Sequence, residues 1–284
     1  MVQSNIRNSG VKIFLTVLKY VVLSLVAVIF LYPFVWMIST SFKHEGDFLS
    51  EGLALITSNP TVENFVRVWT KASFGRYFIN TVVVTVIVTV MVLIITSLCG
   101  YVLGRYHFAG KKAVYALFVS SICIPATTTV IPIYRIISSM SLNGTLTGLI
   151  LATVGGGHVV FILLFQGEFQ SIPNELEEAA LVDGCSFAKM YWQVMLPMAK
   201  PVISTTVIMQ AIWTWNDFLL PLVLTLSNSK SRTLAVGLYV FQGENTIDWT
   251  GICAGASISI IPIIVIFLFM QRYFVEGVAG AVKG

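Results

Sequence analysis

Long apolar stretches separated by shorter polar segments dominate this chain. Six of these stretches are near or above the roughly 20 residues that a helix needs to cross the hydrocarbon of a bilayer. We expect the spans at about 14–38, 78–103, 113–137, 146–165, 201–226 and 252–273. The pattern therefore predicts an all-α, polytopic membrane protein with six transmembrane helices.

The composition supports a membrane protein. Hydrophobic residues make up 56% of the 284 residues and charged residues 11%, whereas a soluble domain averages about 25% charged residues. The net charge is +4, without a basic stripe interleaved with aromatic residues, which argues against a nucleic-acid partner. The four cysteines are scattered, so we interpret them as packing residues and expect neither a disulfide nor a metal site. The first apolar stretch is too long for a cleavable signal peptide.

Basic residues indicate the side of the membrane on which each loop lies. The short segment 104–112 carries three Lys or Arg residues, whereas the turn between the third and fourth spans carries only Arg135. Because cytoplasmic loops are enriched in Lys and Arg, we expect both termini to be cytoplasmic, together with 171–201. The chain then divides into a tail, first helix and outer loop (1–77), a core of five helices (78–275) and a cytoplasmic tail (276–284).

Several spans contain helix-breaking residues. Membrane helices tolerate Gly and Pro more than soluble helices do, so a single one carries little meaning. Several together suggest helices that bend around a pathway. They are Pro33, Pro125, Pro132, Gly155, Gly156, Gly157, Pro221 and Pro262.

One polar stretch, 171–201, separates the fourth and fifth spans. Ser171 and Pro173 are typical of a helix start, and the glutamates that follow suit the positive end of a helix dipole. Asp183-Gly184 is a turn signal. The first half of this stretch therefore predicts a short helix that ends in a turn.

A second short helix is predicted over 187–195, ended by Pro197 and Pro201. The stretch as a whole is thus a helix–turn–helix between two membrane spans. Its small and apolar residues at helical spacing would let another surface approach closely. The residues alone leave two alternatives open, an ordinary solvated loop and a docking surface.

The fixed positions of this stretch resemble the EAA loop of ABC importer membrane subunits. They are Glu178-Ala179-Ala180, Gly184, Val194 and Leu196-Pro197, and the flanks Ile172-Pro173, Glu175-Leu176 and Asp183-Gly184 are similar to the carbohydrate branch of that family. The sequence departs at Val194, where isoleucine is more usual, and at Cys185, where alanine or serine is common. Further similarity to maltose-type permeases lies at Asn59-Pro60, Val62–Phe65, Asn80, Gly100-Tyr101, Arg105 and Trp215–Phe218.

The resemblance implies the type I ABC importer permease fold, in which this loop is a coupling helix that docks in a groove of a cytoplasmic ATPase. The residues expected to couple to the ATPase are Glu175, Glu178, Ala179, Ala180, Asp183, Gly184, Phe187, Leu196 and Pro197. The carboxyl end resembles that of the subunit that inserts its tail between the two ATPases. The implied tail contacts are Gly280, Ala281, Val282, Lys283 and Gly284.

Polar residues interrupt the fifth span, where burying a carboxylate in the bilayer is costly. Gln210, Trp213, Asn216 and Asp217 are candidates for a sugar pathway, with Trp213 or Trp215 as a stacking face. The alternative is that the polar groups cap or pair helices and the tryptophans belong to the interfacial belt. His158 in the fourth span is either a proton or sugar site or, more simply, a hydrogen-bonded packing residue.

The chain has no G-x-x-x-x-G-K-[ST] motif, so ATP hydrolysis would belong to another chain. The resemblance implies a non-catalytic permease without cofactors, with ATP and Mg²⁺ bound by the partner ATPase. The implied partners are a second homologous permease, an ATPase dimer, an extracytoplasmic sugar-binding protein, lipid and a carbohydrate, in the plasma membrane of a prokaryote. Two other classes stay open on the residues alone, a stand-alone secondary transporter coupled to a cation at Asp217 and an intramembrane enzyme.

Overall fold

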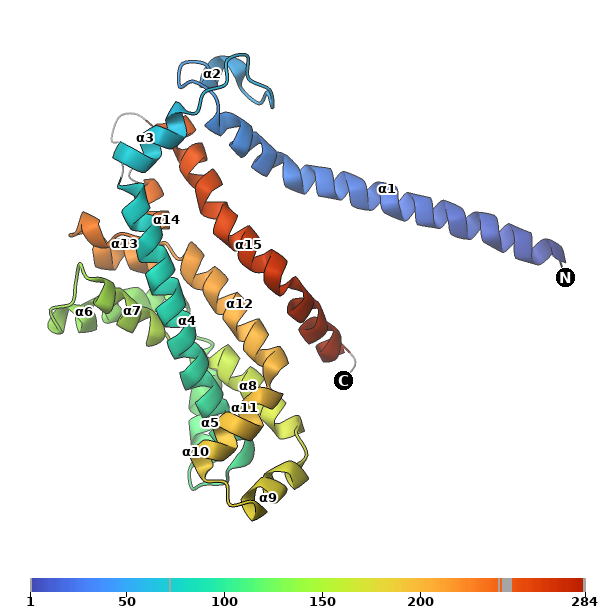
Figure 1. Cartoon of the computed structure of the whole chain (residues 1–284), viewed down its shortest axis with the longest axis vertical. Helices are drawn as coiled ribbons and strands as arrows, with labels where there is room; N and C mark the ends of the chain where they lie inside the picture. The colour runs from blue at the N-terminus through green and yellow to red at the C-terminus, as the bar shows by residue number, and fades with distance from the viewer. Residues whose placement is uncertain (1, 72, 240, 242–246, 283–284) are drawn as a thin grey trace. The chain divides into compact units, whose positions relative to one another are not determined.

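The structure is a computed structural model that describes residues 2–71, 73–239, 241 and 247–282. The regular elements in these ranges are helices (Figure 1). Before the polar stretch they are α1 (Val2–Ser41), α2 (Phe48–Glu51), α3 (Glu63–Lys71), α4 (Phe74–Arg105), α5 (Lys111–Ser121), η1 (Ala126–Thr129), α6 (Val130–Ser139), α7 (Leu146–Val154) and α8 (Val159–Ser171). After it come α12 (Lys200–Asn216), α13 (Leu219–Thr225), η3 (Ser229–Ser231), α14 (Leu234–Tyr239) and α15 (Trp249–Val282).

Three helices of the described residues are long and apolar enough to cross a membrane unbroken, and they lie in α1, α4 and α15. Three bent helix pairs also qualify when each pair is taken as one span. The bends are 99° between 111–121 and 126–139, 50° between 146–154 and 159–171, and 81° between 187–198 and 200–216. Three continuous helices and two bent pairs therefore correspond to five of the six predicted spans, whereas the third bent pair combines α12 with residues 187–198 of the polar stretch.

Two of the bends coincide with residues that the sequence singles out. Pro125 precedes η1 in an extended conformation, and a run of three glycines follows α7. Gly157, the last of the run, has φ of +69°, which L side chains rarely adopt. By contrast, Pro33 and Pro262 lie inside helices that continue past them. The prediction of bent spans is confirmed, but only some of the prolines mark a bend.

The fifth span differs from the prediction of one helix over 201–226. α12 ends at Asn216, Asp217 has extended backbone angles (φ −65°, ψ 128°), and α13 begins at Leu219. Pro221 lies four residues after Asp217, in the first turn of α13, and a proline there offers no N–H to the Asp217 carbonyl. The continuous helix over 201–226 is therefore a wrong prediction, because Pro221 removes the hydrogen bond that would continue the helix past Asp217.

The chain forms two compact units, Met1–Ala72 with Phe241–Ile258, and Ser73–Val240 with Ser259–Gly284. In the first unit, the side chains of 12–35 on α1 are all exposed. A polar network holds the segment after α1: Arg67 donates to Asp248 at 2.8 Å and to Asn64 at 3.1 Å. An exposed face this long and apolar requires lipid or another protein around α1.

The second unit is organised around α4, which packs against α7, α8 and α12. One buried apolar cluster joins α4 to α6, α7, α8 and α13. A second cluster joins its carboxyl-terminal part to α8 and to the polar stretch. The carboxyl-terminal half of α4 therefore lies between the membrane core and the candidate site.

Candidate functional site

The first helix of the polar stretch is α9 (Asn174–Val182), with two glutamates in its first turn, where the helix dipole favours negative charge. Ile172 and Pro173 lead into it in extended conformation. Ser171, predicted as a helix-start residue, is instead the last residue of α8, and its Oγ donates to a carbonyl of that helix at 2.8 Å. The prediction for Ser171 is wrong because α8 continues through it and the two extended residues alone make the turn.

Gly184 ends α9 in the way that a Schellman motif requires. The Cys185 N–H donates to the Ala180 carbonyl, and the Gly184 N–H donates to the Leu181 carbonyl, both at 3.0 Å. Gly184 has φ of +76°, the left-handed conformation in which this motif places glycine. The predicted turn at Asp183-Gly184 is confirmed, and its N–H groups satisfy carbonyls of the last turn of α9.

The second helix is not the single α-helix predicted over 187–195. It consists of α10 (Phe187–Lys189), a π-helical segment η2 (Met190–Met195) and α11 (Leu196–Met198). Ser186 caps it, because its Oγ accepts the Lys189 N–H at 3.4 Å. Pro197 was expected to stop the helix but lies in the first turn of α11, where a proline needs no N–H donor. The helix ends one residue later, before the 81° bend into α12.

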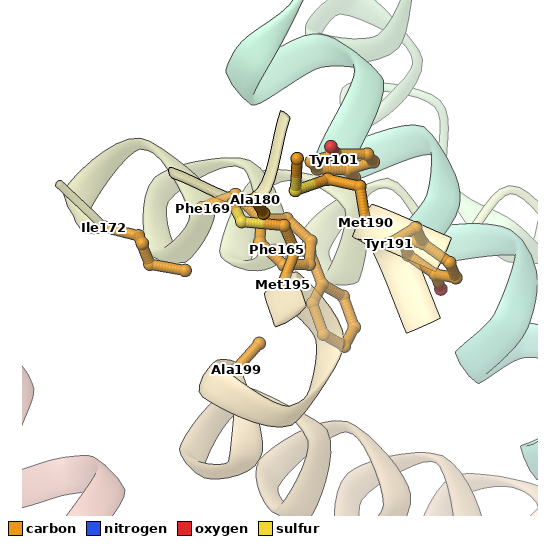
Figure 2. Packing of buried hydrophobic residues seen from close by; sticks show 9 residues of the cluster. All are labelled: Tyr101, Phe165, Phe169, Ile172, Ala180, Met190, Tyr191, Met195 and Ala199. Atoms are coloured by element: carbon orange, nitrogen blue, oxygen red, sulfur yellow. The ribbon is translucent and has the colours of Figure 1, made fainter. Parts of the chain in front are cut away.

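A buried apolar cluster fixes this helix–turn–helix to the core of its unit. Figure 2 shows aromatic side chains from α4 and α8 meeting methionines from η2. The members are Tyr101, Phe165, Phe169, Ile172, Ala180, Met190, Tyr191, Met195 and Ala199. One face of α9 and of η2 is therefore held by apolar burial, which leaves the other face available.

Polar contacts also join α9 to α4. Arg105 donates from Nη1 to Asn174 Oδ1 and from Nη2 to the Ile172 carbonyl, each at 2.6 Å. Its Nε lies 3.3 Å from Glu177 Oε2, and the Tyr101 hydroxyl donates to Glu177 Oε1 at 2.8 Å. The Arg105 side chain is only 6% exposed, so these charge-assisted bonds are shielded from water. They hold the amino-terminal end of α9 in place.

The outer face of α9 carries both acidic and apolar side chains. Leu181 is 62% exposed and Val182 is 88% exposed. Of the predicted coupling residues, Ala180 is buried in the cluster, Leu196 is half-buried, and Glu175, Glu178, Ala179, Asp183, Gly184, Phe187 and Pro197 are exposed. An apolar helix end rimmed by carboxylates is the kind of surface that another protein covers.

The predicted pathway residues lie on α12, and two of them contact side chains of the core. Gln210 is buried and its Nε2 donates to Thr214 Oγ1 at 2.9 Å, while its Oε1 has no hydrogen-bond partner. Trp213 is 47% exposed and stacks on Phe161 of α8, with ring centroids 5.1 Å apart. Trp213 therefore presents one covered and one open face.

The remaining polar candidates have local roles. Asn216 is exposed and donates to the Ile212 carbonyl at 2.8 Å. The Asp217 carboxylate lies next to the backbone N–H groups of 218–220, at the start of α13, as a capping residue does. His158 bonds through Nε2 to the Thr153 carbonyl at 2.9 Å. Among the described residues, no group of three or more His, Cys, Asp or Glu could hold a metal ion.

Comparison with protein families places the chain. The family model described as the binding-protein-dependent transport system inner membrane component matches residues 96–280, well over half of the sequence. The chain belongs to this family. Family membership excludes the stand-alone secondary transporter considered above, because the transport systems of this family depend on a binding protein.

Individual relatives of the chain are also named as permease proteins of transport systems. The chain is 36% identical to the probable ABC transporter permease protein YurM of Bacillus subtilis, over 93% of this chain and 88% of that protein. It is 33% identical to the melibiose/raffinose/stachyose import permease protein MelC of Bacillus subtilis, over 89% and 91%. It is 31% identical to the trehalose/maltose transport system permease protein MalG of Thermococcus litoralis, over 92% and 94%.

A solved structure shows the fold. A bacterial ABC transporter involved in the import of the acidic polysaccharide alginate matches with a TM-score of 0.80 at 24% identity, over 92% of this chain and 96% of that chain. The predicted importer permease fold is confirmed. The chain is a multi-pass membrane component of a transport system, and its family implies a substrate-binding protein and an ATPase as partners.

The predicted tail contacts lie at the carboxyl-terminal end of the chain. Of the predicted tail contacts, Gly280, Ala281 and Val282 belong to the end of α15, and Lys283 and Gly284 lie outside the described residues. The sequence pattern includes Arg105 in the basic segment 104–112 and in the family resemblance, and Glu177 among the glutamates at the helix start, but it does not predict a contact between them. The signal that could have found them is the four-residue spacing of Ser97, Tyr101 and Arg105, which puts the three on one face of a helix.

Proposed function

We propose that this chain is a transmembrane permease subunit of an ATP-driven carbohydrate importer, and that it forms half of the translocation pathway. A carbohydrate substrate is supported by the relatives, whose names give melibiose, raffinose and stachyose in one case and trehalose and maltose in another. The observation that carries the coupling role is the outer face of α9, with exposed Leu181 and Val182 on a helix whose inner face is held in a buried cluster.

In this proposal the outer face of α9 docks in a groove of the partner ATPase. Glu175 and Glu178 would accept hydrogen bonds or pair with basic groups there, and Ala179 leaves room for a close approach. Leu181 and Val182 supply the apolar contact, because a buried aliphatic side chain contributes more to binding than an exposed carboxylate at the rim. The family resemblance adds a second contact, through residues 280–284 between the two ATPases.

The remaining partners follow from the exposed helix faces. The exposed α1 would be covered by lipid and by a second, homologous permease. Both termini and α9 lie in the cytoplasm of a prokaryotic cell, consistent with the basic segment 104–112.

The chain itself catalyses no reaction. ATP and Mg²⁺ bind to the partner ATPase, whose closure moves α9 and opens the pathway to the outside by alternating access.

The docking role predicts that Leu181→Glu weakens ATPase binding. A charge placed in an apolar contact at the centre of an interface costs about 2 kcal/mol, roughly a 30-fold loss in affinity. The measurement is co-purification of the ATPase with the tagged permease from membranes, with the sugar-stimulated ATPase rate as a second readout.

Leu181→Met is the matched control, because it keeps an apolar side chain of similar volume and should retain the ATPase. Leu181 is exposed, so neither substitution should disturb the fold. Full retention of the ATPase by Leu181→Glu would refute docking through this face of α9.

We also propose that the open face of Trp213 contacts the sugar. The prediction is that Trp213→Ala lowers the maximum rate of sugar uptake roughly three- to tenfold, the range expected for loss of one aromatic stack. The ATPase rate that the binding protein stimulates should stay unchanged, because Trp213 lies on α12 and is not among the residues that we propose to dock on the ATPase. Trp213→Phe keeps an aromatic face and should retain most of the uptake. If the open face meets lipid instead, all three proteins will transport equally.

A further inference from the structure

We infer that Ser97, Tyr101 and Arg105 of α4 form the mechanical link that carries movement of α9 into the membrane core. The inference rests on the proposed function, since it concerns how a docked ATPase moves the permease. The three residues are four positions apart, so they lie in one stripe along the helix. Each reaches a different part of the helix–turn–helix.

Arg105 holds the amino-terminal end of α9. Its guanidinium bonds to the Ile172 carbonyl and to the Asn174 side chain, and its Nε faces the Glu177 carboxylate. A third, longer bond reaches the Pro173 carbonyl at 3.5 Å. Because the guanidinium is planar and rigid, contacts on several sides fix both the position and the direction of the helix end. A push on α9 is therefore passed to α4 at this residue.

Tyr101 touches the elements on either side of the turn. Its hydroxyl donates to Glu177 of α9. Its ring lies 5.4 Å from that of Phe169 in α8, and 5.6 Å from those of Phe187 in α10 and Tyr191 in η2. The ring is fully buried, so none of these contacts is loosened by water. Figure 2 shows Tyr101 together with Phe169 and Tyr191.

Ser97 completes the stripe one turn further into the membrane core. Its Oγ and the Tyr191 hydroxyl share a hydrogen bond of 2.6 Å, and both residues are buried. The same Oγ also bonds to the Leu93 carbonyl of its own helix at 2.5 Å. The π-helical segment is therefore joined to α4 by a polar contact at the level where the apolar core begins.

The covalent route from α9 toward the pathway is less direct. Along the chain, a displacement must pass through six π-helical residues and then through the 81° bend before α12. π-helical segments are short and occur mostly as local bulges at functional sites. By contrast, α4 is one unbroken helix of 32 residues that packs against α7, α8 and α12. The connection through the stripe is therefore the stiffer one, even though Tyr101 and Glu177 are 76 positions apart in the sequence.

The test is the coupling ratio, the amount of sugar transported per ATP hydrolysed, in the complete importer reconstituted in vesicles with its binding protein. Arg105→Gln should lower this ratio about tenfold, the effect of losing charge-assisted hydrogen bonds at one residue. ATPase co-purification should be unchanged, because the outer face of α9 is intact. Arg105→Gln combined with Glu177→Gln should be no worse than Arg105→Gln alone, since both remove one ion pair.

Lys112→Gln is the matched control. It removes the same charge from an exposed side chain of the same basic segment and should keep the wild-type ratio. Should Arg105→Gln fail to assemble, Tyr101→Phe, which deletes only one hydroxyl oxygen, carries the test with an expected loss of roughly fivefold.

The outcomes separate the two proposals. A wild-type coupling ratio in both Arg105→Gln and Tyr101→Phe overturns the link. If uptake and ATP hydrolysis fall together, so that the ratio stays constant, the link is also overturned, because the residues then only stabilise the fold. If the ATPase does not co-purify with the wild-type chain at all, the proposed function itself fails, whatever the variants do.

Discussion

Gly100→Ala should lower the unfolding temperature of the purified protein and reduce the amount of chain that accumulates in the membrane. A Cβ at this position would lie 2.9 Å from the Gln166 backbone nitrogen and 3.0 Å from the Ile162 carbonyl oxygen, and closer still to the Phe165 Cβ. Backbone atoms cannot rotate away, so α4 and α8 would have to separate. Overpacking of this kind costs about 1–3 kcal/mol.

The same approach involves Gly104, one helical turn later, which makes Gly100-x-x-x-Gly104 the close-packing motif of membrane helices. A Cβ at Gly104 would lie 3.1 Å from the Gln166 carbonyl oxygen, so Gly104→Ala should cause a smaller loss. Gly100 and Gly104 lie on the same turns of α4 as the stripe of Ser97, Tyr101 and Arg105. Their close approach to α8 therefore also positions the residues that contact α9.

Gly167→Ala is the matched control for Gly100→Ala. Gly167 lies in α8, is exposed, and has nothing within 4 Å of an added Cβ. Because alanine favours a helix over glycine by about 1 kcal/mol, this variant should unfold at the same or a higher temperature. The measurement is thermal unfolding in detergent, followed by gel filtration of the remaining folded protein. Equal unfolding temperatures for the two variants would contradict the close approach of α4 to α8.

Gly184→Asp should abolish most sugar uptake while the chain still inserts into the membrane. Gly184 has φ of +76°, where an L residue costs about 1–2 kcal/mol. Nothing lies within 4 Å of an added Cβ, so the new side chain begins in open space. It does add bulk and charge to the surface that we propose to dock on the ATPase. The expected damage is therefore to coupling and not to folding.

Gly110→Asp separates these two effects. Gly110 has φ of +86° and equally open surroundings, but it lies in the turn before α5 and is not part of the surface that we propose to dock on the ATPase. Both variants carry similar backbone strain, and only Gly184→Asp should lose uptake and sugar-stimulated ATP hydrolysis. The readouts are uptake by cells, abundance of the chain in membranes, and ATPase rate of the purified complex. Uptake at the wild-type level in Gly184→Asp would remove Gly184 from the coupling surface.

Local patterns predict a good part of this molecule. The apolar runs predict six spans because a bilayer selects for length and apolar composition alone, and neither depends on neighbouring helices. Asp183-Gly184 predicts the end of α9, since a left-handed residue in a Schellman motif is a property of six consecutive residues. Pro221 breaks the fifth span at Asp217, whereas Pro33 and Pro262 lie inside helices that continue, and local sequence does not separate these cases. The π-helical form of η2 has no sequence signal of its own.

The sequence by itself determined the fold class, the approximate positions of the spans and the place of the polar stretch that we propose as the coupling surface, because each is encoded in residues next to one another in the chain. Only the tertiary structure decided which face of α9 is free. Ala180 belongs to the same motif as the exposed Glu178 and Ala179 but is buried against η2. The bond from Tyr101 of α4 to Glu177 likewise joins residues 76 positions apart, and no local pattern specifies a contact over that separation.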